Sequence, residues 1–428
     1  MTPLLNKNFS SPHAESTGVT LLAILYFFFN SFFLPQGLLY TAILTPYFLW
    51  WLYTRRELKW LGYFFLFTIP FIPVQLYYGM ELWDYARSYV MFFTAAVFGI
   101  SVFVFLKNGN AVQIIFRRIL FINFIFMIIA LFFLPFPLLK KTLWFLNEFS
   151  PGTGTLPRLK MLSYEASYYA LLIAPVAIYF YLRIILYKNN RPLLIFLMVT
   201  LPLLLSLSVG VIAGILLAFI ILFSAYPRDF LRNSFNIKYL ILGSALFISC
   251  AVFFIINFPH NPIAFRIINI FTGNDSSFRA RTYESFILAW NIVKHKSVIF
   301  GCGPGQAKLL GVQVFKDYYG YLPPVVRIPN TLADTLATYG ILGLFIRLML
   351  TIYFFFKTRV AHNYYRLGLF IFMFIYQFTG SFLTNIAEYF IWILAFTQGF
   401  REFDKELFIK KIEIFHKGLI IKEEYVSQ

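Results

Sequence analysis

Cysteine, histidine and acidic residues are scarce in this chain. Its 428 residues include 2 cysteines, 5 histidines and 18 aspartates and glutamates, against 36 lysines and arginines. Cys250 lies in an apolar stretch and Cys302 in a polar one, so the two thiols are expected at different depths and not in a disulfide. No Cys/His cluster has the spacing of metal ligands, and there is no D-x-D sequence. A metal site, including a nucleotide-sugar site with a bound metal, is therefore not expected.

Charged residues of either sign are also few. They make up 13% of the chain, against about 25% in soluble proteins, whereas apolar residues make up 60%. Backbone groups inside a bilayer must be satisfied within the segment, so the recurring apolar runs are expected to be helices. The sequence predicts an all-α polytopic membrane protein of about 12 transmembrane helices, with one large extracytoplasmic loop that carries an interfacial helix. The predicted spans are residues 19–34, 38–53, 60–79, 88–106, 119–138, 166–187, 192–206, 209–226, 239–258, 331–356, 367–384 and 386–400.

Polar segments divide these spans into groups. Residues 1–18 form a polar tail with no basic n-region or cleavage site, so the first apolar run is expected to be a retained span. Nine spans fill residues 19–258, with an outer loop at 139–165, and three more fill 330–400 around a split at Thr384 and Asn385. That last pair is equally compatible with one span and a re-entrant segment. Residues 401–428 alternate apolar and basic side chains, which predicts a helix lying on the inner leaflet.

The orientation follows from the basic residues of the short loops. Cytoplasmic loops are enriched in lysine and arginine, and this rule is met throughout if both termini are cytoplasmic. The formal net charge of +18 is partly this signature, so a nucleic-acid partner need not be invoked. The inner basic residues are Arg55, Arg56, Lys59, Lys107, Arg117, Arg118, Lys188, Arg191, Arg228, Arg232, Lys238, Lys357, Arg359 and Arg366, followed by those of the C-terminal tail.

The outer loop 259–329 carries positive charge that this rule does not explain. It has eight basic and three acidic residues, which gives +5. One interpretation is contact with lipid headgroups. The other is that arginines gather around an anion, because a guanidinium holds phosphate oxygens with two hydrogen bonds. At the outer leaflet such an anion would be a polyprenyl pyrophosphate carrying a sugar. The basic residues are Arg266, Arg279, Arg281, Lys294, Lys296, Lys308, Lys316 and Arg327, and the acidic ones are Asp275, Glu284 and Asp317.

A helix with one apolar face is predicted inside this loop. Asp275, Ser276 or Ser277 can cap its N-terminus, and Arg281 and Glu284 are spaced to pair. The face would lie on the membrane surface and consists of Tyr283, Phe286, Ile287, Trp290 and Val293. The glycine turn at 301–305 that follows matches neither a Walker loop nor a dinucleotide fingerprint, since Gln306 replaces the required glycine. A structural turn is the favoured interpretation, and backbone contact with a phosphate is the alternative.

Acidic residues mark the outer ends of several spans. Glu165 begins the span at 166–187, shortly after Arg158, and Asp334 and Glu388 are placed likewise. A carboxylate there often only interacts with the helix dipole. The alternative for Glu165 is a general base that accepts a proton from a sugar hydroxyl. Ionisable residues in apolar spans are functional candidates, and this applies to Asp334 and Glu388.

Three segments between about Arg158 and Leu350 resemble the Wzy-type O-antigen and capsule polymerases and their O-antigen ligase relatives. Residues 163–170, SYEASYYA, are similar to the F-x-E-P-S-aromatic-A segment of that family, with Ala166 in place of proline. Arg279 and Arg281, followed by Trp290 and the glycine turn, resemble its R-x(n)-W-x(n)-G-x-G stretch. Residues 329–332, PNTL, and 339–343, YGILG, look like its H-N-x-x-L and G-x-x-G segments. Pro329 replaces the histidine of the ligases, which favours a polymerase, and Val209 replaces an arginine common in the S-R-x-G turn.

The resemblance implies a polysaccharide polymerase of the bacterial inner membrane. Such an enzyme moves a growing glycan from undecaprenyl pyrophosphate to a new lipid-linked repeat unit at the outer face, without a cofactor. Its partners would be the undecaprenyl-pyrophosphate-linked oligosaccharide, the lipid bilayer and a chain-length-regulating co-polymerase. An O-antigen ligase and a lipid-linked oligosaccharide flippase are the alternatives, although a transporter usually has internal repeats and none is visible. The expected catalytic residues are Glu165, Arg279 and Arg281, and the expected substrate-binding residues are Arg158, Arg266, Arg327, Asn330 and Asp334.

Overall fold

The computed structural model is almost entirely helical. It describes residues 12–35, 37–107, 112–146, 155–187, 191–233, 261–323 and 325–407, together with 249, 256 and 257. The first two-thirds of the chain forms α1 (Pro12–Ile24), η1 (Leu25–Phe29), α2 (Tyr40–Ile43), α3 (Thr45–Thr54), η2 (Leu58–Trp60), α4 (Leu61–Thr68), α5 (Phe71–Tyr77), α6 (Leu82–Lys107), α7 (Val112–Phe133), α8 (Pro137–Leu143), α9 (Ala166–Leu186), α10 (Pro192–Leu205), α11 (Val209–Ala225) and α12 (Pro227–Asn233). The remainder forms α14 (Pro262–Phe271), α15 (Ser276–Arg281), α16 (Tyr283–Lys294), α17 (Gln306–Tyr319), α18 (Thr331–Lys357), η3 (Val360–His362), α19 (Tyr364–Tyr376), α20 (Ile386–Phe396) and η4 (Arg401–Phe403). One small antiparallel sheet joins β1 (Trp144–Phe145) to β2 (Arg158–Leu159).

Five segments of the described chain are long and apolar enough to cross a membrane. They are Leu58–Tyr77, α6, α7, α9 and α18. A polytopic membrane protein is thus supported, but twelve continuous helices are not. The predicted span 38–53 is divided between α2 and α3, and 239–258 lies outside the described residues except at 249, 256 and 257. The helices near the predicted spans 19–34, 192–206, 209–226, 367–384 and 386–400 have fewer than 18 residues.

Several breaks occur where the sequence predicted them. The apolar stretch 192–226 forms two helices that are separated at Ser206–Ser208. The last pair also divides as expected, because α19 ends at Tyr376 and α20 begins after Asn385, whose side chain accepts a hydrogen bond from Ala387 N. Other breaks were not expected. The predicted span 60–79 is interrupted at Ile69 and Pro70, since proline lacks the N–H that a continuous helix needs.

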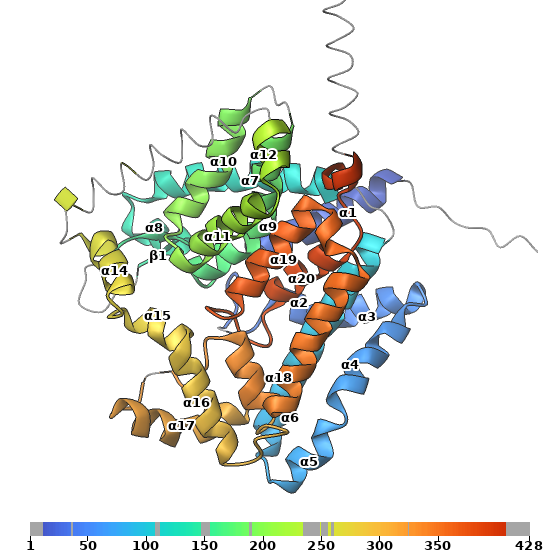
Figure 1. Ribbon diagram of the computed structural model, residues 1–428, viewed down its shortest axis with the longest axis vertical. Helices are drawn as coiled ribbons and strands as arrows, with labels where there is room; N and C mark the ends of the chain where they lie inside the picture. The colour runs from blue at the N-terminus through green and yellow to red at the C-terminus, as the bar shows by residue number, and fades with distance from the viewer. Residues whose placement is uncertain are drawn as a thin grey trace, which may run out of the picture.

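The longest helical segment, α18, is interrupted at Gly340. This glycine has φ 67° and ψ −167°, which is not helical. Arg347 Nη1 lies 3.5 Å from Thr335 Oγ1. Twelve residues of continuous helix would separate the two backbones by about 18 Å, so the chain reverses at Gly340 and the two arms lie side by side. Figure 1 shows both arms in orange. The 27-residue segment counted above as a candidate span is therefore a helical hairpin with arms 331–339 and 341–357, and the prediction of one continuous helix over 331–356 is wrong.

The glycine turn at 301–305 holds the tip of this hairpin. Cys302 N and Gly303 N donate to the carbonyls of Ala337 and Thr338 at 2.9 Å, while Ile341 N donates to Val298 O at 3.0 Å. Backbone groups left unpaired by the break are thereby satisfied. Gly301 and Gly340 have φ of 74° and 67°. A Cβ on Gly301 would clash with Thr338 O, and a Cβ on Gly340 would clash with Ile299 O, so neither position has room for a side chain. The structural interpretation of the turn is therefore confirmed.

Alanine at Gly301 is expected to destabilise the hairpin. Gly320 is a matched control, because its φ of 75° is nearly the same but no heavy atom lies within 4 Å of its Cβ position. Gly320→Ala should cost only the left-handed backbone strain of about 1–2 kcal/mol. Gly301→Ala should add an overpacking cost of about 1–3 kcal/mol. Thermal unfolding in detergent measures both, and equal midpoints for the two variants would contradict the tip contact.

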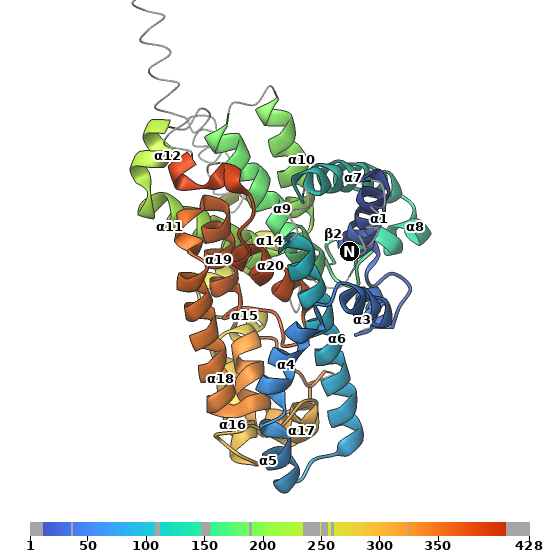
Figure 2. The same ribbon diagram turned by 90° about the vertical axis from the view of Figure 1, so that its right-hand side faces the viewer.

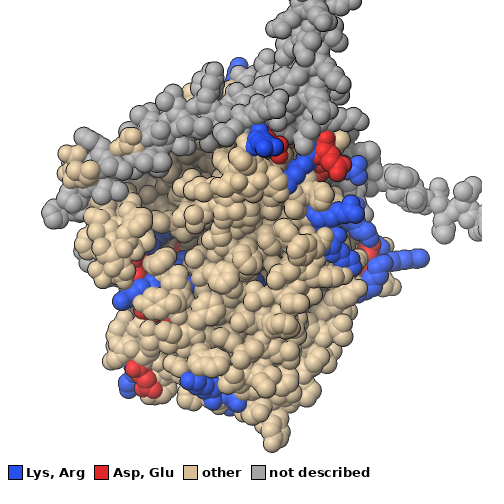
Figure 3. Space-filling model, in the orientation of Figure 1, with Lys and Arg blue, Asp and Glu red and all other residues tan. Residues whose placement is uncertain are grey.

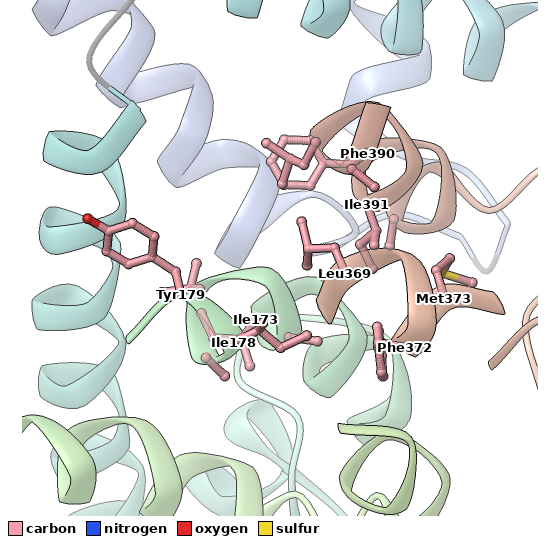
Figure 4. Packing of buried hydrophobic residues seen from close by; sticks show 14 of the residues in the cluster. Ile173, Ile178, Tyr179, Leu369, Phe372, Met373, Phe390 and Ile391 are labelled. Atoms are coloured by element: carbon pink, nitrogen blue, oxygen red, sulfur yellow. The ribbon is translucent and has the colours of Figure 1, made fainter. Parts of the chain in front are cut away.

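Apolar side chains from α9, α19 and α20 form the main core. Figure 4 shows Ile173 and Ile178 near Leu369 and Phe372, with Phe390 and Ile391 above Leu369, whereas the Tyr179 ring points away from this group. Nearly every residue of α9 is buried, so this helix runs through the centre of the bundle. Arg366 of α19 is buried as well, and its guanidinium donates to Ala395 O at 2.9 Å and Thr358 O at 2.7 Å. It ties three helices together, so its expected place in an open cytoplasmic loop is wrong.

Two helices of the polar loop lie far from α12. In both views α16 and α17 lie toward the lower end and α12, which carries Arg228, lies at the upper end, whereas α14 and α15 of the same loop lie between them (Figures 1 and 2). The predicted membrane orientation stays a prediction. Helix α1 begins at Pro12, inside the polar segment 1–18, and its apolar part begins at Gly18, close to the predicted start of the first span.

The membrane orientation is testable by labelling. Ser276 is exposed at the start of α15. Burial raises the pKa of the Cys302 thiol to about 12, so this native cysteine should react little. In a chain with both native cysteines replaced by alanine, Ser276→Cys is expected to react with an impermeant maleimide on intact spheroplasts. Labelling that requires lysis would reverse the orientation.

Candidate functional site

The polar loop is an ordered layer of four helices. Asp275 caps α15, as predicted, by accepting a hydrogen bond from Phe278 N at 2.6 Å. The predicted continuous amphipathic helix is instead broken at Thr282, whose φ −106° and ψ −110° are not helical. On α16, Tyr283, Ile287 and Trp290 are exposed as expected for a surface on lipid. Val293 was assigned to that face wrongly, since it is buried.

Three arginines from distant parts of the chain converge beside this layer. Arg158 belongs to β2, Arg266 to α14 and Arg281 to the end of α15. Burial, together with the charges of Arg266 and Arg281, lowers the pKa of Arg158 to about 10, and Glu165 opposes the shift. Burial also lowers the pKa of Arg266, with Asp275 opposing and Arg281 adding to the shift. The three guanidinium groups are therefore within electrostatic range of one another. We call Arg158, Arg266 and Arg281 the arginine cluster.

Local contacts hold the first two members in place. Arg158 Nε donates to Ser206 O at 3.2 Å, and its guanidinium lies 5.9 Å from the centre of the Phe145 ring. Arg266 Nε lies 3.5 Å from Asp275 Oδ2. Asp275 thus caps α15 and fixes Arg266 with the same carboxylate. A guanidinium so fixed is preorganised for an anion, because little side-chain freedom remains to be lost on binding.

Glu165 and Tyr164 border the arginine cluster. Burial, Tyr168 and Glu165 raise the pKa of Tyr164, and Arg327 opposes the rise. Arg327, which is exposed, is therefore within electrostatic range of Tyr164. Tyr376, at the end of α19, is within electrostatic range of both Arg281 and Glu165. Sequence reasoning did not select Tyr164 or Tyr376, although Tyr164 precedes Glu165 in the family-like segment.

The Glu165 side chain does not cap its helix. Glu165 is the N-cap residue of α9, yet its carboxylate accepts no backbone N–H there. Its Oε1 accepts the hydroxyl of Ser167 at 2.5 Å. The dipole of α9 still acts on this carboxylate. Within the described part of the chain, no hydrogen bond to its Oε2 holds it away from a ligand near Arg158.

Arg279 does not belong to the arginine cluster. Its Nε lies 3.5 Å from Glu284 Oε1, and Glu284 Oε2 accepts the hydroxyl of Tyr319 at 2.9 Å. The predicted pairing of Glu284 with Arg281 is therefore wrong. Residues two apart on a helix face away from each other, so α15 turns Arg281 toward the arginine cluster and Arg279 toward α16 and α17. The catalytic role predicted for Arg279 remains a prediction without geometric support.

Asn330 has a structural position behind Arg281. It is fully buried, and its Nδ2 donates to Arg281 O at 2.9 Å and to Phe378 O at 2.6 Å. Its Oδ1 accepts Ala333 N at 3.0 Å, which caps the first arm of α18. Asp334 Oδ2 accepts Leu383 N at 2.9 Å. The side chains of Asn330 and Asp334 thus make hydrogen bonds within the protein. Direct contact of either one with a substrate stays a prediction.

An ion pair lies deeper in the bundle. Arg347, on the second arm of α18, pairs with Glu388 of α20, which is 1% exposed. The sequence predicted Glu388 at the outer end of a span, but it did not predict a partner for this carboxylate. Sequence reasoning missed Arg347, although an arginine inside an apolar run is a signal of a buried partner.

Charge is sparse over most of the visible surface. Figure 3 shows a nearly uncharged exterior, with blue and red atoms recessed at the left, near the position of α14 and α15 in Figure 1. A recessed set of guanidinium groups next to one carboxylate suits a ligand with a multiply charged anionic group and adjacent hydroxyls. Among the described residues, no three His, Cys, Asp or Glu side chains group as metal ligands would. No family model matches the chain, and no curated protein matches it.

Proposed function

We propose that this protein is a polysaccharide polymerase of the bacterial inner membrane. It would transfer a growing glycan from undecaprenyl pyrophosphate to a new lipid-linked repeat unit on the outer face. The apolar helices support a membrane location. The separation of α16 and α17 from α12 supports one outward working surface (Figure 2).

The observation that carries the proposal is the convergence of the arginine cluster on Glu165. Arg158, Arg266 and Arg281 come from three separate segments and lie close enough to perturb one another. Like charges repel, and gathering three of them disfavours the folded state unless negative charge is also present. Asp275 and Glu165 supply two carboxylates, which leaves a surplus positive charge for an anion. A pyrophosphate provides that anion, with several oxygens for bidentate hydrogen bonds.

Each group has a distinct role in the proposed transfer. The arginine cluster stabilises charge on the departing undecaprenyl pyrophosphate as the bond from the anomeric carbon to the phosphate oxygen breaks. Glu165 accepts the proton from the attacking hydroxyl of the acceptor repeat. The donor sugar already carries a good leaving group, so the transfer requires no nucleotide. Arg327 and Tyr164 lie where they can contact the sugars at the edge of the site.

Extension of purified lipid-linked repeats tests the proposal. The purified protein in detergent is expected to convert single repeats into a ladder of longer glycans. In a deletion strain with an O-antigen system, lipid A is expected to carry one repeat unit. Lipid A with no repeat would indicate a ligase, and absence of lipid-linked repeats from the outer face would indicate a flippase.

A further inference from the structure

Arg281 sits on an element that cannot fix its own position. Helix α15 has 6 residues and ends at the non-helical Thr282. So short a helix has little intrinsic stability. Its orientation must therefore come from contacts with the rest of the protein. At its C-terminal end, the carbonyl of Arg281 accepts the hydrogen bond from Asn330.

A chain of buried hydrogen bonds links this contact to the ion pair. Thr331 follows Asn330 directly, and its Oγ1 donates to Glu388 Oε2 at 2.7 Å. Glu388 Oε1 pairs with Arg347 and lies 3.4 Å from Trp392 Nε1. Asn330, Thr331 and Glu388 are each at most 1% exposed. The path from Arg347 to Arg281 is thus continuous and shielded from water.

The ion pair has no part in the proposed proton or phosphate chemistry. A buried pair contributes little net stability compared with apolar residues of the same size, because both charges are desolvated. Its specific effect here is geometric. Glu388 fixes the start of α18 by holding Thr331, and Thr331 N also donates to Gly380 O at 3.2 Å.

We propose that the Arg347–Glu388 pair positions Arg281. The pair acts through Thr331 and Asn330 on the Arg281 backbone and so directs its guanidinium into the arginine cluster. This inference rests on the proposed function for its effect on catalysis. The positional link itself does not depend on which reaction the site performs.

Thr331→Val tests the link most directly. Valine keeps the shape of threonine and leaves the ion pair intact, but it removes the hydrogen bond to Glu388. Amide hydrogen exchange at residues 279–283 is expected to become about tenfold faster on loss of one hydrogen bond. Extension should slow about 10- to 100-fold, since small displacements of a catalytic group have effects of this size. Exchange in α17 should not change, and the unfolding temperature should fall only by the amount expected for loss of one buried hydrogen bond. Neither property should change in Lys316→Ala, an exposed control.

Two further variants separate positioning from general stability. Combined with Arg281→Lys, Thr331→Val should add less than about twofold, because coupled residues are not additive. Glu388→Gln is expected to loosen residues 279–283 in the same way and also to lower the unfolding temperature, since it leaves Arg347 without its charged partner. Unchanged exchange at 279–283 in Thr331→Val overturns the inference, whatever happens to extension. If the wild-type protein extends no repeats, the proposed function is wrong, and the exchange comparison alone then decides the link.

Discussion

Arg281→Lys is expected to slow extension of lipid-linked repeats by about 10²–10³-fold, the usual effect of losing one preorganised donor to a developing negative charge. Lysine keeps the charge but loses the planar fork that binds two phosphate oxygens. Arg281 belongs to the arginine cluster, and its charge helps to lower the pKa of both Arg158 and Arg266. A residue that only contacted lipid headgroups would tolerate lysine.

Arg279→Lys is the matched comparison for this prediction. The two arginines are two residues apart on one short helix, and Arg279 pairs with Glu284. Its pair is partly exposed, so lysine should preserve most of the interaction, which is worth about 0–1 kcal/mol. Extension within about threefold of wild type is expected, because a shift of that size is less than 1 kcal/mol in the barrier. Equal, severe loss in both variants would contradict the division of roles, and normal extension by both would reject the pyrophosphate site.

Glu165→Gln is expected to lower extension by about 10²–10⁴-fold, as for loss of a general base. Glutamine keeps the size of the side chain and can still accept the hydroxyl of Ser167. The Glu165 carboxylate does not cap α9, so its replacement should affect the fold little. Donor binding and the unfolding temperature should therefore remain near those of wild type.

Glu81→Gln is the control for a carboxylate that serves only its helix. Glu81 Oε2 accepts Asp84 N at 2.6 Å at the start of α6. Its neutralisation should cost about 0.3–1 kcal/mol of stability and leave extension unchanged. If Glu165→Gln behaves in the same way and makes polymer of normal length, Glu165 is a helix-terminal charge and not a base.

The sequence correctly predicted features that depend on residues close together in the chain, such as helix ends and helix caps. Apolar composition predicted membrane helices, and Ser206–Ser208 and Asn385 marked real helix ends. Asp275 was correctly identified as a cap, because a capping side chain bonds to a backbone group only three residues away. Arg158, Arg266, Arg281 and Glu165 were all selected from charge and family-like segments. In the structure the three arginines are within electrostatic range of one another, and Glu165 is within range of Arg158. Their roles stay predictions.

Relations between distant segments could not be predicted in this way. Glycine occupies helical and left-handed conformations with similar ease, so Gly340 gave no sign of the reversal that its contacts with residues 298–301 impose. The pairing of Arg279, and not Arg281, with Glu284 depends on where α15 breaks relative to α16.

The sequence by itself therefore determined that this is a membrane protein with apolar helices and that its polar segment 259–329 is basic. Both depend on composition and on the spacing of nearby residues. The tertiary structure alone decided that Glu165 leaves its helix uncapped, that Asn330 holds Arg281 from behind, and that Arg347 meets Glu388. Each of these contacts joins helices or loops whose relative placement is set by packing of the whole bundle, and no local pattern encodes that placement.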